Sequence, residues 1–194
     1  MLEPFVNIID EVSDGHKIDR VFDDHEGITI HRVGYNHKYG IDLGETAAEI
    51  CGHFTGRNAQ YPEVAKATGG ELAYTIMIGK AGVPWQCLPL SDIGHHARRW
   101  SYKTVGVAVI GDPRYVPLTN EQYWSLVDVC SIISRVLGTS SVHVKGHDEL
   151  PGGMRDKTKE CPGKLLSMSQ LRHDVWRVMR ASAEQEALRV GLSP

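Results

Sequence analysis

The chain has 194 residues, of which 41% are hydrophobic and 23% charged, and its formal net charge is -3. This length suits one domain with a single core, and the charge excludes the strongly basic surface expected of a nucleic-acid binder. No segment approaches the roughly 20 apolar residues that span a bilayer, and the start of the chain lacks the basic region of a signal peptide, so we expect synthesis in the cytoplasm.

The first third of the chain predicts a strand and a helix after an irregular, polar opening. Residues 27–33 (GITIHRV) are β-branched and typical of a short strand, in which His31 lies on the face opposite Ile28 and Ile30. A Thr-x-x-Glu capping box then precedes apolar residues at helical spacing, which predicts a helix over 46–55.

Three strands and a helix are predicted in the middle of the chain. The strands fall at residues 72–79, 83–90 and 105–111, the first two forming a hairpin around Lys-Ala-Gly. The third strand, VGVAVIG, is entirely apolar and suits the centre of a sheet. Thr119 and Gln122 form a second capping box, ahead of an apolar periodicity that runs as a helix to Gly138.

The last part of the chain predicts a strand at 141–147, ending on His147, and a helix over about 168–185. Strands and helices therefore mix within one unit, and we expect a single α/β domain whose central mixed β-sheet of five to six strands is flanked by helices. Its core covers about 27–167, and residues 168–194 form a helical extension.

The four cysteines show no CxxC pairing, which argues against a disulfide framework or a four-thiolate zinc site. Cys51, Cys87 and Cys130 lie in apolar runs and are predicted to be core residues. Cys161 lies instead in the polar segment DKTKECPGK. This cysteine therefore needs another explanation.

A catalytic zinc site usually takes three protein ligands and leaves one position open. His31 in one strand, His147 at the end of another, and Cys161 can be brought together by a sheet. Each residue alone is more commonly structural, and His147 and Cys161 are 14 positions apart, which exceeds the spacing of compact zinc motifs.

Four ordered segments carry a more specific signal: ITIHRVG, ELAYTIMIGKAG, IGHHARRWSYKTVGVAVIGD and VKGHDELPGGMRDKTKECPG. Together they resemble the type 2 N-acetylmuramoyl-L-alanine amidase family, which is related to peptidoglycan recognition proteins. The Lys-x-Cys-Pro ending and the tyrosine of the second segment resemble the phage lysozyme-amidases most. The resemblance implies a zinc-dependent enzyme that hydrolyses the amide between N-acetylmuramic acid and L-alanine in peptidoglycan.

The resemblance also implies a role for particular residues. It assigns the zinc ligands to His31, His147 and Cys161, and the catalytic residues to Tyr74 and Lys159. Two imidazoles and one thiolate would leave the zinc site with one positive charge, which favours ionisation of a bound water. The Lys159 ammonium would stabilise the developing oxyanion, and the Tyr74 phenol would assist proton transfer.

Other positions either extend this resemblance or depart from it. His96 in GHHA matches a histidine near the family's substrate groove and is predicted to contact substrate. Ser101 replaces the asparagine common before the central strand, and VGVAVIG lacks the glutamate of cytoplasmic anhydromuropeptide amidases. The segment GGMRDKT looks like an insertion beside the site, which is expected to affect substrate choice.

Two alternatives to the amidase stay open from the residues alone. One is a peptidoglycan-recognition module of the same fold without catalysis. The other is a cysteine peptidase with Cys161 as nucleophile and His147 as base, although the proline after Cys161 offers no helix N-terminus to activate the thiol.

The biological setting is predicted only in outline. A cytoplasmic wall hydrolase without a signal peptide fits a monomeric phage endolysin that reaches the peptidoglycan of the periplasm after release, and a secreted antibacterial effector remains open. The C-terminal helix alternates apolar residues with arginines. Packing on the core is its default role, and weak contact with an anionic outer membrane is the alternative.

Overall fold

The computed structural model describes residues 6–7, 26–33, 74–152 and 160–191. Its sheet has six strands in the order β1-β4-β3-β5-β2-β6. Every neighbouring pair is parallel except the antiparallel pair β3 and β4, so the sheet is mixed, as predicted. The strands are β1 (Val6–Asn7), β2 (Gly27–Val33), β3 (Ile76–Ile78), β4 (Pro84–Gln86), β5 (Thr104–Ile110) and β6 (Val144–Gly146).

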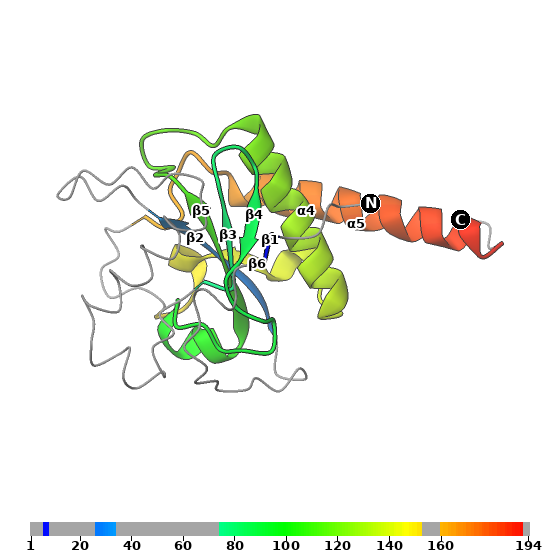
Figure 1. The fold of residues 1–194 in the computed structure, drawn as a ribbon, viewed down its shortest axis with the longest axis horizontal. Helices are drawn as coiled ribbons and strands as arrows, with labels where there is room; N and C mark the ends of the chain where they lie inside the picture. Colours follow the sequence, from blue (N-terminus) through cyan, green and yellow to red (C-terminus); the bar gives the residue numbers. More distant parts are fainter. Residues whose placement is uncertain (1–5, 8–25, 34–73, 153–159, 192–194) are drawn as a thin grey trace.

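Two long helices, α4 (Asn120–Val136) and α5 (Met168–Arg189), lie together on one side of this sheet (Figure 1). Alternation along the strands supplies the apolar face on which they pack, because successive side chains of a strand point to opposite faces. Ile28, Ile30 and Val107 belong to this buried core together with Leu126 of α4 and Leu171 of α5. The opposite face of β2 presents Thr29, His31 and Val33.

Helix α4 begins as its sequence predicts, but its capping residue Gln122 has a different role. The Thr119 hydroxyl accepts a hydrogen bond from the backbone N–H of Gln122, which satisfies one of the open donors of the first turn. The Gln122 amide does not return to the cap. It donates to the carbonyls of Ile78 in β3 and Ile110 in β5, so it ties the helix to the sheet.

Helix α5 packs on the domain mainly through its first half. Leu171 and Val175 are fully buried, and the phenol of Tyr123 in α4 donates a 2.8 Å hydrogen bond to the Asp174 carboxylate. The second half of α5 extends beyond the rest of the molecule (Figure 1), and Leu188 is 61% exposed. The predicted helix over 168–185 is confirmed and continues for one further turn.

Several predicted elements differ in extent. Residues 141–143 form a short 3-10 helix, η3 (Ser141–His143), so the predicted strand at 141–147 reduces to β6. The predicted strands at 72–79 and 83–90 reduce to β3 and β4. Strand β1 was not anticipated from its polar surroundings.

The predicted helix over 46–55, and Cys51 with it, lies outside the described residues. Cys87 and Cys130 are fully buried, which confirms their assignment to the core. Within the described part of the chain, no helix is both long and apolar enough to cross a membrane.

Candidate metal centre

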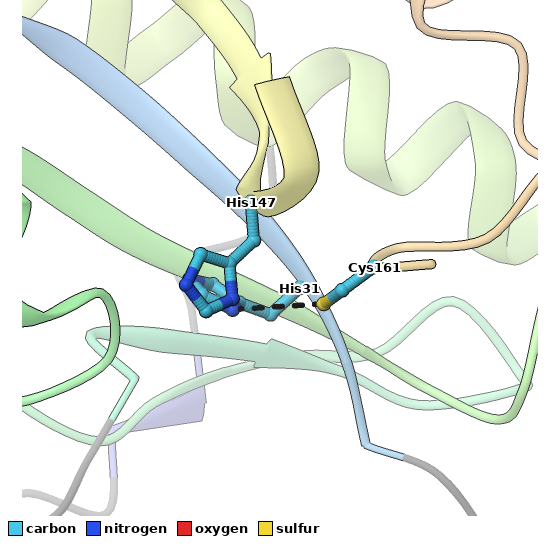
Figure 2. Close-up of side chains that lie close together, drawn as sticks. All are labelled: His31, His147 and Cys161. Carbon is cyan, nitrogen blue, oxygen red and sulfur yellow. Dashed lines mark hydrogen bonds between the residues drawn. The ribbon is translucent and has the colours of Figure 1, made fainter. Parts of the chain in front are cut away.

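Two histidines and a cysteine from three separate elements converge at one edge of the sheet. His31 belongs to β2, His147 opens the short helix η4 (His147–Glu149), and Cys161 lies in the loop before α5. One possible ligand atom from each side chain lies within 4.8 Å of the other two. The Cys161 Sγ is 3.9 Å from the His31 Nδ1, and Figure 2 shows the three side chains pointing toward one another.

The register of the sheet explains why the two histidines meet. Strands β2 and β6 are parallel neighbours, and Ile30 pairs with Gly146. The residue that follows each member of this pair is therefore one of the histidines, His31 within β2 and His147 directly after the end of β6. Their ring centroids are 4.5 Å apart. A single strand pairing thus brings together two histidines that are 116 positions apart in the sequence.

The Cys161 loop is held against the end of β6 by backbone contacts. The Asp148 N–H donates a 2.9 Å hydrogen bond to the Cys161 carbonyl. A side chain at Gly146 would meet Pro162 at 2.9 Å and the Asp148 carboxylate at 2.7 Å, so only glycine permits this close approach. Gly163, with φ of 123°, similarly lies against the backbone of Pro113.

An ion-pair network supports the same loop from the other side. Arg32 donates from Nε to the Glu160 carbonyl at 3.2 Å and from its guanidinium to the Asp112 carboxylate at 3.0 Å. Arg114 binds the same carboxylate through two side-chain nitrogens. Burial alone would raise the pKa of Asp112, but the hydrogen bonds from Arg114 and the charge of Arg32 lower it overall.

The donor set and its spacing fit a zinc ion. Nitrogen and sulfur ligands at 2.0–2.3 Å from one tetrahedral ion lie about 3.3–3.6 Å apart, so the 3.9 Å between Sγ and Nδ1 needs only a small adjustment. Imidazole nitrogens and cysteine thiolates are also both ligand types that zinc takes. His31 is 2% exposed and Cys161 is partly buried, so competition from water is limited.

Tyr74 lies beside the candidate ligand His31. It is 6% exposed, and its ring centroid is 5.0 Å from that of His31 with the rings tilted by 41°. Lys159 lies outside the described residues, which resume at Glu160. The catalytic roles of Tyr74 and Lys159 stay predictions.

His96 is also adjacent to the centre, although it is 9% exposed and both of its ring nitrogens lie at hydrogen-bond distance from protein atoms. Direct contact of His96 with substrate stays a prediction. Ser101 stands where the sequence resemblance leads us to expect an asparagine. Its hydroxyl accepts hydrogen bonds from the backbone N–H groups of His96 and Ala97. The serine thereby anchors the segment that carries His96.

Two side chains, one basic and one aromatic, hold the loop after His147. Trp100 donates from its indole nitrogen to the Pro151 carbonyl at 2.9 Å, and Arg99 donates to the same oxygen at 3.1 Å. Both belong to η2 (Arg98–Tyr102), which immediately precedes β5. This helix therefore fixes the path of the chain on leaving the metal centre.

Solved structures share this fold. The N-acetylmuramoyl-L-alanine amidase LysC from Clostridium intestinale URNW is 16% identical, with a TM-score of 0.61 over 89% of this chain and 97% of that chain. The Ph2119 endolysin from a Thermus scotoductus bacteriophage is 13% identical, with a TM-score of 0.63 over 89% and 99%. Drosophila peptidoglycan recognition protein SD is 17% identical, with a TM-score of 0.60 over 84% and 90%. No curated protein sequence matches significantly.

The α/β fold is thus that of peptidoglycan amidases and recognition proteins. Residues 22–164, well over half of the chain, match the N-acetylmuramoyl-L-alanine amidase family (Amidase_2), and the protein belongs to this family. The matched range includes all three converging side chains. This confirms the family and the fold class that the four sequence segments predict.

Proposed function

We propose that the protein is a zinc-dependent N-acetylmuramoyl-L-alanine amidase, which hydrolyses the amide between N-acetylmuramic acid and L-alanine of peptidoglycan. The convergence of His31, His147 and Cys161 carries this proposal. Three ligand atoms within 4.8 Å are what a catalytic zinc site with one open position requires. Membership of the amidase family supplies the reaction class and the substrate.

The surrounding residues are suited to amide hydrolysis. Zinc in such a site acts as a Lewis acid and activates water as a nucleophile. Tyr74 packs on the His31 ring, and this contact supports a role in which its phenol would donate a hydrogen bond to the reacting amide. Lys159, two residues before Cys161, would supply positive charge to the oxygen on which negative charge develops.

The state of Cys161 argues against the cysteine peptidase. Burial raises the pKa of the Cys161 thiol to about 11, and the nearby Arg32 offsets only part of this effect. A thiol with this pKa is protonated near neutral pH and is a poor nucleophile. A metal cation displaces the proton from such a ligand, so the same environment suits a zinc thiolate.

A recognition module without catalysis differs from the amidase in its need for a complete metal site. A binder needs no complete metal site, whereas here all three side chains of the predicted ligand set come together. We therefore favour the enzyme. The structural similarity to a recognition protein does not separate the two, because at 17% identity it concerns the fold.

Digestion of purified peptidoglycan tests these three functions together. Mass spectrometry should detect new L-alanine amino termini, which disappear after treatment with a chelator and return with added zinc. Turnover that survives metal removal but not thiol alkylation would establish the peptidase instead. Tight binding of peptidoglycan without any new termini would establish the recognition module.

We further propose that this amidase is an endolysin, made in the host cytoplasm and acting on the cell wall after release. The Clostridium intestinale amidase LysC and the Ph2119 endolysin support this role, because the alignment covers 97% and 99% of their own lengths. Lysis of chloroform-permeabilised Gram-negative cells by the purified protein tests this role. Absence of lysis, with activity on purified walls intact, would contradict it.

A further inference from the structure

The His96 imidazole lies behind the metal centre, between a candidate ligand and the backbone of β5. Its Nδ1 is 2.9 Å from the Nε2 of His31, and its Nε2 is 3.0 Å from the carbonyl oxygen of Thr104. The His31 and His96 rings meet edge to face at 82°, with centroids 5.0 Å apart. The contact uses the His31 nitrogen that does not face Cys161.

If both imidazole rings are neutral, only one arrangement of their protons allows both of these hydrogen bonds to form. The Thr104 carbonyl is an acceptor, so the facing nitrogen of His96 must carry the proton. The Nδ1 of His96 is then an acceptor, and it takes a hydrogen bond from the Nε2–H of His31. The Nδ1 of His31 is consequently unprotonated, and it faces the Cys161 Sγ at 3.9 Å.

Two features of the sequence keep the His96 ring in place. A side chain at Gly106 would meet the His96 ring at 2.7 Å, so the glycine in the middle of β5 provides the space that this ring fills. The Ser101 hydroxyl accepts hydrogen bonds from the backbone N–H groups of His96 and Ala97, which holds the segment at its base.

We propose that His96 is a positioning residue, which fixes the tautomer and the ring orientation of His31 so that Nδ1 is presented to zinc. The hydrogen-bonded chain runs from the Thr104 carbonyl through His96 to His31. A ligand histidine usually donates its second N–H to a carboxylate, a carbonyl or water. Here a second histidine takes that place, and its own tautomer is set by the backbone. The inference rests on the proposed zinc site.

Zinc affinity of three variants tests the role of the His96 acceptor. In His96→Leu the acceptor is lost, and the zinc dissociation constant, measured by competition with a chromophoric chelator, should rise about 10–100-fold. In His96→Asn the amide Oδ1 lies close to the position of the lost Nδ1, so it should restore most of the affinity. His95→Leu is the matched control, because the neighbouring His95 ring packs against Tyr102, and it should bind zinc like the wild type.

The imidazole nitrogen shifts of the zinc-loaded wild-type protein provide a second readout that needs no variant. Long-range proton–nitrogen correlation spectra should show His31 and His96 both protonated on Nε2, with Nδ1 of His31 bound to the metal. A proton on Nδ1 of His96, or unaltered zinc affinity in His96→Leu, would overturn the positioning role. Either result can occur while the wild type binds zinc. Absence of zinc binding by the wild type would instead overturn the metal site itself.

Discussion

Cys161 is the residue on which the proposed chemistry depends most, because it alone among the described cysteines lies with two histidines. Replacing it by alanine removes one of three ligands, so Cys161→Ala should contain almost no zinc by elemental analysis. Cys130→Ala is the control, since this buried thiol belongs to the core between α4 and the sheet, and it should keep its zinc. Equal zinc in both variants would contradict the ligand assignment.

The two predicted catalytic side chains should behave differently from the ligands. Tyr74→Phe and Lys159→Ala leave all three ligands in place, so both variants should bind zinc normally. Each should lower kcat by about 10²-fold or more, because a proton donor or an oxyanion partner is lost. Release of L-alanine termini per bound zinc is the measurement. An unchanged kcat would remove that residue from the mechanism.

Asp112 links the pH dependence of stability to the support of the Cys161 loop. Its pKa is lowered in the folded protein, so its ionised form stabilises the fold at neutral pH. This contribution is present above the pKa of the unfolded chain and is lost as the pH falls through the lower pKa of the folded chain.

Asp112→Asn should therefore unfold more easily than the wild type at pH 7, by about 2 kcal/mol, since it weakens hydrogen bonds to two guanidinium groups. The difference should shrink steadily as the pH falls below 4. Urea unfolding at several pH values measures it. A difference that does not change with pH would show that the charge of Asp112 is unimportant.

The sequence indicates which residues are candidates for the site, but it does not show which residues they contact. His31, His147 and Cys161 were identified through resemblance of their segments, because their convergence depends on strand pairing that no local pattern contains. The role of His96 depends on a carbonyl in β5 and on space above Gly106. The glycine within the apolar run VGVAVIG was the available signal, because glycine inside a strand often marks a close approach.

At the scale of elements, local patterns predicted the elements with strong periodicity. The strand at 27–33 coincides with β2, and α4 begins at the predicted cap. The sequence predicts one strand over 141–147, but only residues 144–146 pair with β2. Strand β1 consists of two residues whose pairing with β4 is entirely non-local. Such short pairings leave no periodic pattern to detect.

Helix α5 combines a structural half with an exposed half, and the two can be separated by mutation. Leu171→Ala should destabilise the protein by about 2–5 kcal/mol, because this side chain is 0% exposed in the core beneath α5. Leu188→Ala, at an exposed position of the same helix, should change the unfolding free energy by less than about 0.5 kcal/mol. Similar losses in both variants, measured in urea, would contradict the described docking of α5.

The exposed half of α5 is also where the predicted contact with an outer membrane would lie. Arg180 and Arg189 each pair with a glutamate on the same helix, so part of the positive charge is balanced locally. This balance weakens attraction to an anionic surface, because a paired arginine contributes less to the field than a free one. The membrane contact stays a prediction from the charge pattern.

At the scale of the whole molecule, the sheet separates two tasks. One face, covered by α4 and α5, holds the apolar core that stabilises the fold. Strand β2, the end of β6 and the loop before α5 carry the candidate ligands, and Tyr74 and His96 lie against His31. Parallel strands place their carboxyl ends together, so the same pairing that builds the core also assembles the metal centre.

Zinc titration of the metal-free protein tests the central claim most directly. Release of L-alanine amino termini from purified peptidoglycan should rise in proportion to added zinc and level off at one equivalent per chain. The same titration of His31→Ala should show no activity at any amount of zinc up to one equivalent per chain. Full activity of the metal-free wild type, or equal activation of His31→Ala, would contradict a zinc amidase built on His31, His147 and Cys161.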